Sequence, residues 1–269
     1  MNLIELKQSY QKQISKVTVP SQKVKQLTKF FLSNEFKTVN DSSLIKSEFF
    51  SKFEEKKYLQ SKFFQHKQHD SVDCKKKRFI DLIGSSIGLL LILIIFFPIA
   101  LVIKIDSPGS IFYSQIRCGL QGKPFRIWKF RTMVEGAELQ QYLVDNEIEG
   151  CLFKNKNDPR ITRVGKFLRR TSLDELPQFW NVFKGEMSLV GTRPPTLDEV
   201  KNYQDRHYKR LLVKPGLTGE WQVYGRSNIK QFDDVVNMDI DYQNKWSFLY
   251  DIKLILMTIR VVALGKGAY

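Results

Sequence analysis

The chain has 269 residues, of which 42% are hydrophobic and 26% charged, so it is long enough for one or two packed domains and too apolar to be wholly disordered. Its three scattered cysteines, Cys74, Cys118 and Cys151, exclude a disulfide scaffold and favour a reducing compartment. A net charge of +15 predicts an anionic partner, which is a nucleic acid, a phosphorylated substrate or an acidic membrane surface.

Residues 1–74 form a basic N-terminal extension. It mixes lysine with polar residues and phenylalanine and has no apolar stretch followed by a small-residue cleavage site, so we expect no signal peptide. A modest amphipathic run lies between Val24 and Phe36. Three interpretations of the extension stay open: it packs on a membrane, it recruits a partner, or it is a solvated tether.

The dominant apolar segment runs from Phe79 to Ile105 and follows a basic run. Its interior, Ile87 to Ile103, has 17 residues without a charge, which is at the short end for a helix that crosses a bilayer. Pro98 lacks a helix-forming amide and predicts a kink, while Asp81 places a charge in the first turns. We therefore predict a re-entrant membrane helix over residues 75–106 that leaves by the face it entered. A straight span and a buried core helix are the alternatives.

Residues 107–269 have the character of a water-exposed domain. Alternation around Ile111 to Gln115 and again over Phe125 to Phe130, with glycines between, predicts a β-hairpin. Helical patterns follow at residues 135–146, at 161–170, from Asp174 onward, at 197–212 and at 252–264, and the last of these fits either the core or a membrane surface. The predicted fold class is α+β and mostly helical, with a kinked membrane helix, a small hairpin and interfacial helices.

The richest stretch for chemistry runs from Asn157 to Pro195. Adjacent carboxylates, Asp174 and Glu175, follow a series of arginines and lysines and are followed by another arginine. Guanidinium groups hold phosphate oxygens in a fork, and carboxylates bind Mg²⁺ or attack phosphorus. An aspartate nucleophile forms an aspartyl phosphate and divides one displacement into two. The pattern is typical of phosphoryl transfer.

A structural role for the same carboxylates is the competing interpretation. Ser172 and Glu175 have the spacing of a capping box, and acidic residues are common in a first helical turn. Pro177 favours Asp174 as the N-cap instead, because the proline then falls within the first turn, where no amide partner is lost. In either case Asp174 is expected at a helix start, beside unpaired amides that also suit phosphate.

The motifs themselves resemble those of a known family. SLDELPQ from Ser172 and MSLVGTRP from Met187 look like the bacterial sugar transferases, the monotopic polyprenyl-phosphate phosphoglycosyl transferases. Supporting matches are KRFIDLIGS from Lys77, KIDSPGSIFYSQ from Lys104, KFRTM from Lys129, DPRITRVGKFLRRTS from Asp158, KPGLTGEWQVYGRS from Lys214 and GKGAY from Gly265. The similarity covers residues 75–269.

The resemblance implies transfer of a sugar-1-phosphate from a UDP-sugar to polyprenyl (undecaprenyl) phosphate, with UMP released, at the cytoplasmic face of a bacterial inner membrane. It makes Asp174 the nucleophile and Glu175 a Mg²⁺ ligand. It places the membrane kink at Pro98, and it weakly favours glucose or galactose as the sugar. The expected partners are the UDP-sugar, polyprenyl phosphate and membrane lipids, with no nucleic acid and a possible homodimer. The residues expected to bind phosphate are Arg131, Arg160, Arg169 and Arg193.

A function of another class stays open beside it. A basic, membrane-tethered scaffold or nucleic-acid-binding protein would also carry a net charge of +15. Such a protein would bind its partner with a steep salt dependence and without any need for Asp174.

Overall fold

The computed structural model describes residues 67–263 apart from 148, 154, 226–228 and 230. The chain falls into two units, Met1–Phe53 and Glu54–Tyr269, and every described residue belongs to the second. The amphipathic run at 24–36, most of the predicted extension and the terminal GKGAY motif lie outside the described residues.

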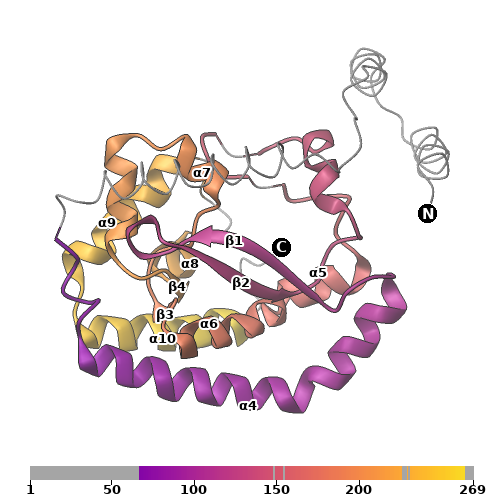
Figure 1. The fold of residues 1–269 in the computed structure, drawn as a ribbon, viewed down its shortest axis with the longest axis horizontal. Coiled ribbons are helices and arrows are strands. Elements are labelled where there is room, and N and C mark those ends of the chain that lie inside the picture. Colours follow the sequence, from indigo (N-terminus) through magenta and orange to yellow (C-terminus); the bar gives the residue numbers. More distant parts are fainter. Residues whose placement is uncertain (1–66, 148, 154, 226–228, 230, 264–269) are drawn as a thin grey trace, which may run out of the picture. The chain divides into compact units, whose positions relative to one another are not determined.

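The apolar segment is one long helix, α4 (Lys75–Asp106), of 32 residues. By length and composition it could cross a membrane, and only 22% of its most apolar window is buried. Large side chains such as Leu93, Ile94 and Phe97 are each at least 75% exposed, so the alternative of a buried core helix is wrong. Pro98 lies inside α4, and Figure 1 shows the helix bending along its length.

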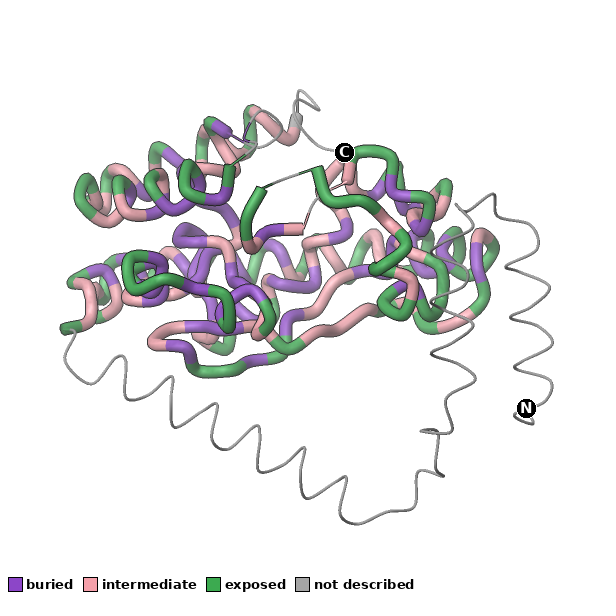
Figure 2. Tube along the Cα trace, turned by 90° about the horizontal axis from the view of Figure 1, so that it is seen from above, coloured by how far each residue is buried: buried purple, intermediate pink, exposed green. Residues whose placement is uncertain are grey.

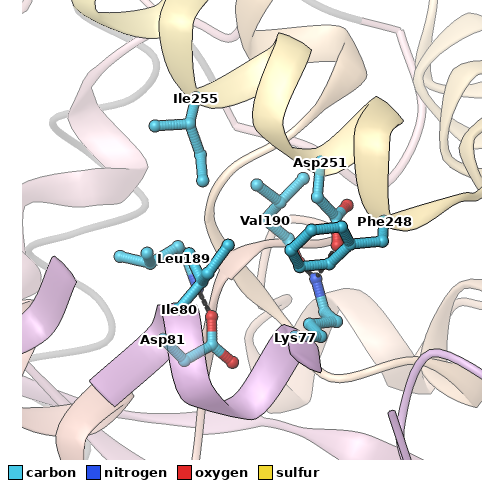
Figure 3. A pocket seen from close by; sticks show the side chains of 8 residues that line it. All are labelled: Lys77, Ile80, Asp81, Leu189, Val190, Phe248, Asp251 and Ile255. Carbon is cyan, nitrogen blue, oxygen red and sulfur yellow. Dashed lines mark hydrogen bonds and ion pairs between the residues drawn. The ribbon is translucent and has the colours of Figure 1, made fainter. Parts of the chain in front are cut away.

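The first turns of α4 are fastened by two charged side chains. Lys77 Nζ donates to Asp251 Oδ2 at 2.6 Å and to the Val190 carbonyl at 2.8 Å. Asp81 Oδ1 accepts from the amide of Leu189 at 2.8 Å. Figure 3 shows these side chains converging on a small cavity between α4, the strand that contains Val190, and the C-terminal helix α10 (Phe248–Ala263). The charge at Asp81, which would be costly in lipid, is therefore buried against protein.

The last turn of α4 is held by other parts of the same unit. Asp106 Oδ2 accepts from the Val164 amide at 2.9 Å, and Ile103 is 3% exposed. Arg131 donates to the carbonyls of Ser107 and Pro108, directly after the helix. Both ends of α4 are thus fixed to one folded body, and the exposed apolar residues lie between them.

The predicted hairpin is confirmed. Strand β1 (Phe112–Cys118) pairs antiparallel with β2 (Pro124–Phe130), with Phe112 opposite Phe130 and Tyr113 opposite Lys129. Paired residues in an antiparallel ladder share a face. At the open end of the hairpin the Phe112 ring stacks on Phe96 of α4, so this end faces the apolar helix.

Short helices follow the hairpin. Residues 135–146 contain only the 3-10 helix η2 (Ala137–Leu143) instead of a full α-helix. Helix α5 (Arg163–Arg170) begins at Thr162, whose hydroxyl accepts from the Gly165 amide. The 3-10 helix η3 (Leu173–Gln178) then leads directly into α6 (Phe179–Lys184).

The prediction of a single helix over residues 197–212 is wrong. The structure has two helices there, α7 (Leu197–Lys201) and the 3-10 helix η4 (Asp205–Leu212). Gln204 and His207 form a reciprocal capping box between them, and such a cap starts a new helix instead of continuing the old one.

A parallel strand pair, β3 (Ser188–Val190) and β4 (Gly216–Thr218), lies in the centre of the unit and was not predicted. Val190 is 1% exposed and packs with Met187, Tyr242 and Leu254 in one of the core clusters. Three residues per strand are too few to show an alternating pattern in sequence.

The C-terminal part is helical: α8 (Glu220–Tyr224), α9 (Phe232–Lys245) and α10 (Phe248–Ala263). On α10 Leu254 is fully buried, while Leu249 and Leu256 are 75% and 62% exposed. Figure 2 shows buried and exposed residues alternating along the long helices. The two interpretations of residues 252–264, core or surface, therefore apply to two faces of one helix.

Candidate active site

The carboxylate pair lies in a tight turn between two helices. Helix α5 ends at Thr171, and Ser172 then adopts a left-handed backbone conformation with φ of 57° before η3 begins at Leu173. The Ser172 side chain makes no capping hydrogen bond, and Asp174 lies inside the first turn of η3. Both capping predictions are therefore wrong: Ser172 and Glu175 form no capping box, and Asp174 is not the N-cap.

Asp174 is buried, with an exposed fraction of 7%. Burial is the main cause that raises the pKa of its carboxyl to about 6, and the negative charge of Glu175 raises it further, while Lys129 and Arg169 lower it. At neutral pH the carboxylate is still mostly ionised. It is a charged carboxylate with little water around it, and a carboxylate in this form is able to attack phosphorus.

Glu175 is the more accessible member of the pair, because its side chain is 37% exposed. Its Oε1 accepts from Lys129 Nζ at 2.7 Å. Lys129 belongs to β2 and lies opposite Tyr113, so the hairpin delivers this ammonium group to the carboxylates. Lys129 was not among the predicted site residues, although the KFRTM motif contains it.

Arg169 is the predicted phosphate ligand that lies near Asp174. Its Nε donates to Thr132 Oγ1 at 2.9 Å, which fixes the plane of the guanidinium. Burial lowers the pKa of Arg169, and the negative charge of Asp174 is the largest effect that opposes this shift. Arg169 and Lys129 thus put two positive charges around Asp174.

Arg160 and Arg131 have other contacts. Arg160 forms a buried ion pair with Asp158 at 2.7 Å and donates to the Ala137 carbonyl. Arg131, 7% exposed, donates to the backbone that follows α4. Both guanidinium groups join segments of the fold, and their binding of phosphate stays a prediction.

Arg193 lies on the segment between β3 and α7. Its Nη1 donates to Glu199 Oε2 at 3.0 Å, and its side chain is 22% exposed. A second arginine, Arg117 of β1, lies near the same carboxylate, at 4.0 Å from Glu199 Oε1. Arg117 was also missed. Its alternation with Tyr113 and Gln115 along one strand face was the signal that could have found it.

The donor set is compatible with Mg²⁺. Among the described residues no three His, Cys, Asp or Glu side chains gather as a metal site. Mg²⁺ commonly uses only one or two protein carboxylates, with water and substrate phosphate completing its shell. Asp174 and Glu175 are adjacent, and Glu175 is partly exposed, so these carboxylates meet that requirement.

Comparison with known proteins decides the family. A model of the family described as bacterial sugar transferase matches residues 72–265. The chain belongs to the bacterial sugar transferase family. The matched region contains the hairpin, the Asp174–Glu175 pair and the arginines around it, and it confirms the resemblance carried by the motifs.

Several relatives are similar over the same region. Galactosyl transferase CpsE of Streptococcus agalactiae is 52% identical over 194 residues, which are 71% of this chain and 43% of CpsE. The UDP-glucose:undecaprenyl-phosphate glucose-1-phosphate transferase of Escherichia coli is 38% identical over 72% of this chain and 41% of its own. ExoY of Rhizobium meliloti, an exopolysaccharide production protein, is 39% identical over 72% of this chain and 88% of its own. The chain thus spans about two fifths of the length of the first two relatives.

Proposed function

We propose that the chain transfers a sugar-1-phosphate from a UDP-sugar to polyprenyl phosphate and releases UMP, which starts synthesis of an exopolysaccharide or another surface glycan. The observation that carries the proposal is a buried, ionisable Asp174 with Lys129 and Arg169 around it. Family membership supports it, since relatives are named as transferases of this kind. The same names disfavour the non-enzymatic scaffold as an alternative.

The proposed reaction has two displacements at one phosphorus atom. A carboxylate oxygen of Asp174 attacks the β-phosphorus of the UDP-sugar, an O–P bond forms, and the bond to the bridging oxygen breaks so that UMP leaves with the electron pair. An oxygen of polyprenyl phosphate then attacks the same phosphorus and displaces Asp174. Lys129 and Arg169 stabilise the charge that builds on the phosphoryl oxygens in both steps.

Glu175, with Asp174 beside it, would hold Mg²⁺. When bound, Mg²⁺ would neutralise charge on the diphosphate. Glu175 Oε1 already accepts from Lys129 Nζ at 2.7 Å, so the ion would lie close to the ammonium group that acts in both steps.

The proposed location is the cytoplasmic face of the bacterial inner membrane, with α4 re-entrant. A straight helix of 32 residues would extend about 48 Å and put its ends on opposite sides of a bilayer. Both ends of α4 instead bond to the same folded unit, at Lys77 and at Asp106. A bend at Pro98 fits this arrangement. Homodimer formation remains a prediction.

The sugar is proposed to be galactose or glucose. CpsE is named as a galactosyl transferase, a Salmonella typhimurium relative as an undecaprenyl-phosphate galactose phosphotransferase, and the Escherichia coli relative as a glucose-1-phosphate transferase. Since the relatives differ in sugar, UMP release measured with both UDP-sugars would decide between them.

A covalent-labelling experiment tests the mechanism. With a UDP-sugar labelled in its β-phosphate and no lipid acceptor, the wild-type protein should retain label in a hydroxylamine-sensitive form, as expected of an acyl phosphate. Asp174→Asn should retain none, because the amide is not a nucleophile. Polyprenyl phosphate should discharge the label. The matched control is Asp198→Asn, which changes an 88% exposed carboxylate on α7 and should label normally.

The outcome also separates the candidate functions. A folded Asp174→Asn protein that releases UMP at the wild-type rate would show that Asp174 is structural. If the wild type releases no UMP from any UDP-sugar in a membrane with polyprenyl phosphate, the transferase proposal itself is wrong.

A further inference from the structure

Two neighbouring arginines share one carboxylate. Glu199, whose side chain is 8% exposed, bonds to Arg193 at 3.0 Å and lies 4.0 Å from Arg117. Burial lowers the pKa of Arg117 to about 10, and the positive charge of Arg193 is the next largest cause. These three groups carry a net positive charge, which is costly in a place with little water unless an anion neutralises it.

Arg210, a structural arginine in the same unit, differs from Arg117 in its carboxylate partner. Arg210, 1% exposed, has its own carboxylate, since its Nε donates to Asp239 Oδ2 at 2.6 Å and its Nη1 to the Tyr203 hydroxyl at 2.6 Å. Each arginine has one buried nitrogen without an acceptor among the described residues, Nη2 in Arg210 and Nε in Arg117. The difference is in the charge: Arg117 has no carboxylate of its own there, because its Nη1 donates to the Pro194 carbonyl and Glu199, 4.0 Å away, bonds to Arg193. Arg117 therefore has both charge and a donor to offer a ligand.

Backbone pairing brings the two arginines together. Arg117 forms a β-bridge with Thr196, and the Cys118 amide donates to the Pro195 carbonyl at 2.9 Å. The segment that follows Arg193 is thus attached to the end of β1 by an isolated bridge. The position of Arg117 is fixed by the fold and does not depend on its side-chain bonds.

The location of Arg117 favours a water-soluble ligand. Arg117 shares a hairpin face with Tyr113 and Lys129, so it borders the same site as Glu175. It lies five residues beyond Phe112, about 16 Å along the strand, at the end away from the ring contact with α4. A nucleotide reaches this end more readily than the phosphate of a lipid whose chain stays in the membrane.

We propose that Arg117, together with Arg193, binds the phosphate group that leaves as UMP. The inference rests on the proposed function. Lys129 and Arg169 are the cations beside Asp174, so they serve the phosphate that is transferred. Arg117 and Arg193 form a second positive group at the turn end of the hairpin, which suits the phosphate of the leaving nucleotide. A pair of guanidinium groups stabilises the charge that the bridging oxygen gains as UMP departs.

UMP is the direct probe, because it contains only the phosphate that leaves. We expect Arg117→Gln to weaken UMP binding to the full chain by about 10- to 100-fold and to lower kcat/KM for the UDP-sugar by a similar factor. The matched control is Arg126→Gln. Arg126 is an exposed arginine on the other face of the same hairpin, bonded to Ser114, and its change should leave UMP binding at the wild-type level.

A double-mutant cycle tests whether the two arginines hold one phosphate. If they do, Arg117→Gln combined with Arg193→Gln should weaken UMP binding by much less than the product of the two single effects. Independent effects would contradict a shared phosphate. If Arg117→Gln does not fold, Arg117→Lys decides, because it keeps the charge but loses the Nε donor and the planar fork, and it should still weaken UMP binding.

Discharge of the labelled protein by polyprenyl phosphate identifies the alternative ligand. Unchanged UMP binding in Arg117→Gln, with slower discharge, would assign Arg117 to the lipid phosphate and overturn the proposal. Wild-type values in both assays would give Arg117 a structural role only, which also overturns it. A wild type that binds UMP tightly and with Arg117 dependence, yet forms no covalent intermediate, would instead count against the proposed transfer mechanism.

Discussion

The Asp174 carboxyl is buried, and burial disfavours its ionised form. The environment that raises the pKa of this carboxyl from 3.8 to about 6 also keeps water away from it. It also makes the ionised group less favourable in the folded state than in the unfolded chain. We therefore expect the ionised Asp174 to lower the free energy of unfolding, while the same burial makes its carboxylate more reactive.

The pH dependence of stability tests this expectation. Because the pKa of Asp174 is raised on folding, its contribution favours the folded state below about pH 4 and is lost as the pH rises through about 6. Asp174→Asn removes the ionisation, so at pH 8 it should be more stable than the wild type by about 1 to 3 kcal/mol, and the difference should vanish near pH 4. Denaturant unfolding at the two pH values measures it. A variant less stable than the wild type at pH 8 would contradict burial as the dominant influence.

At the scale of residues, the sequence was enough to single out the adjacent carboxylates, whose reaction stays a prediction, but not the cations around them. Asp174 and Glu175 are adjacent in the chain, so a short motif is enough to find them. Lys129 and Arg117 come from different strands, and which face each occupies depends on the register of the hairpin. Arg160, a predicted phosphate ligand, forms a buried ion pair with Asp158, and the sequence alone cannot distinguish such a local pair from a ligand site.

At the scale of elements, the contact between α4 and α6 depends on a glycine. A Cβ atom on Gly88 would lie 2.3 Å from the ring of Phe179, the first residue of α6. Only a residue without a side chain allows this approach. Since η3 runs directly into α6, this contact also supports the turn that contains Asp174.

Gly88→Leu should therefore push α6 away from α4. Overpacking of this kind costs about 1 to 3 kcal/mol, which exceeds the gain of about 1 kcal/mol from removing a helical glycine. We expect a lower thermal unfolding midpoint and slower UMP release. Ser86→Leu, which places the same side chain on the exposed face of α4, is the control and should change neither. Equal behaviour of the two variants would show that α6 is not sensitive to this contact.

Elements with a strong local pattern were predictable, and those fixed by distant partners were not. The hairpin and α4 were identified because alternation and a long apolar run are visible within a few residues. Strands β3 and β4 exist because Ser188 and Gly216, far apart in the chain, pair across the core. The single helix expected over 197–212 failed at Gln204, whose side chain caps a new turn and breaks the apolar period.

For the whole molecule, exposed apolar side chains are shared among several helices. Outside α4, large apolar residues at least 40% exposed occur on α5, α6 and α10, and also on η2 and α8: Phe167, Trp180, Phe183, Leu249, Leu256, Ile259, Leu139, Tyr142, Leu143 and Tyr224. Soluble proteins rarely expose that many near one long apolar helix. Interfacial helices beside a re-entrant α4 would use them to contact lipid.

Membrane topology is tested with single cysteines. In a chain with Cys74→Ser, Cys118→Ala and Cys151→Ser, we place one cysteine before α4 by Asp73→Cys or one after it by Ser110→Cys; both positions are exposed. A re-entrant helix predicts that an impermeant thiol reagent labels both from the cytoplasmic side only. Labelling from opposite sides would establish a straight span. The same pair with Pro98→Leu shows whether the proline is needed for the return.

The bond between Lys77 and Asp251 also constrains the order of events at the ribosome. The two residues are 174 positions apart, and at 5 to 20 residues per second the carboxylate is made about 10 to 35 s after the lysine. During that interval Lys77 lacks the Asp251 carboxylate that accepts from it in its buried position, so the ammonium group stays hydrated. Helix α4 can reach lipid early, but its first turn cannot be withdrawn from water until α10 has been synthesised. Closure of the folded unit is thus a late event in biogenesis, completed by the last helix of the described chain.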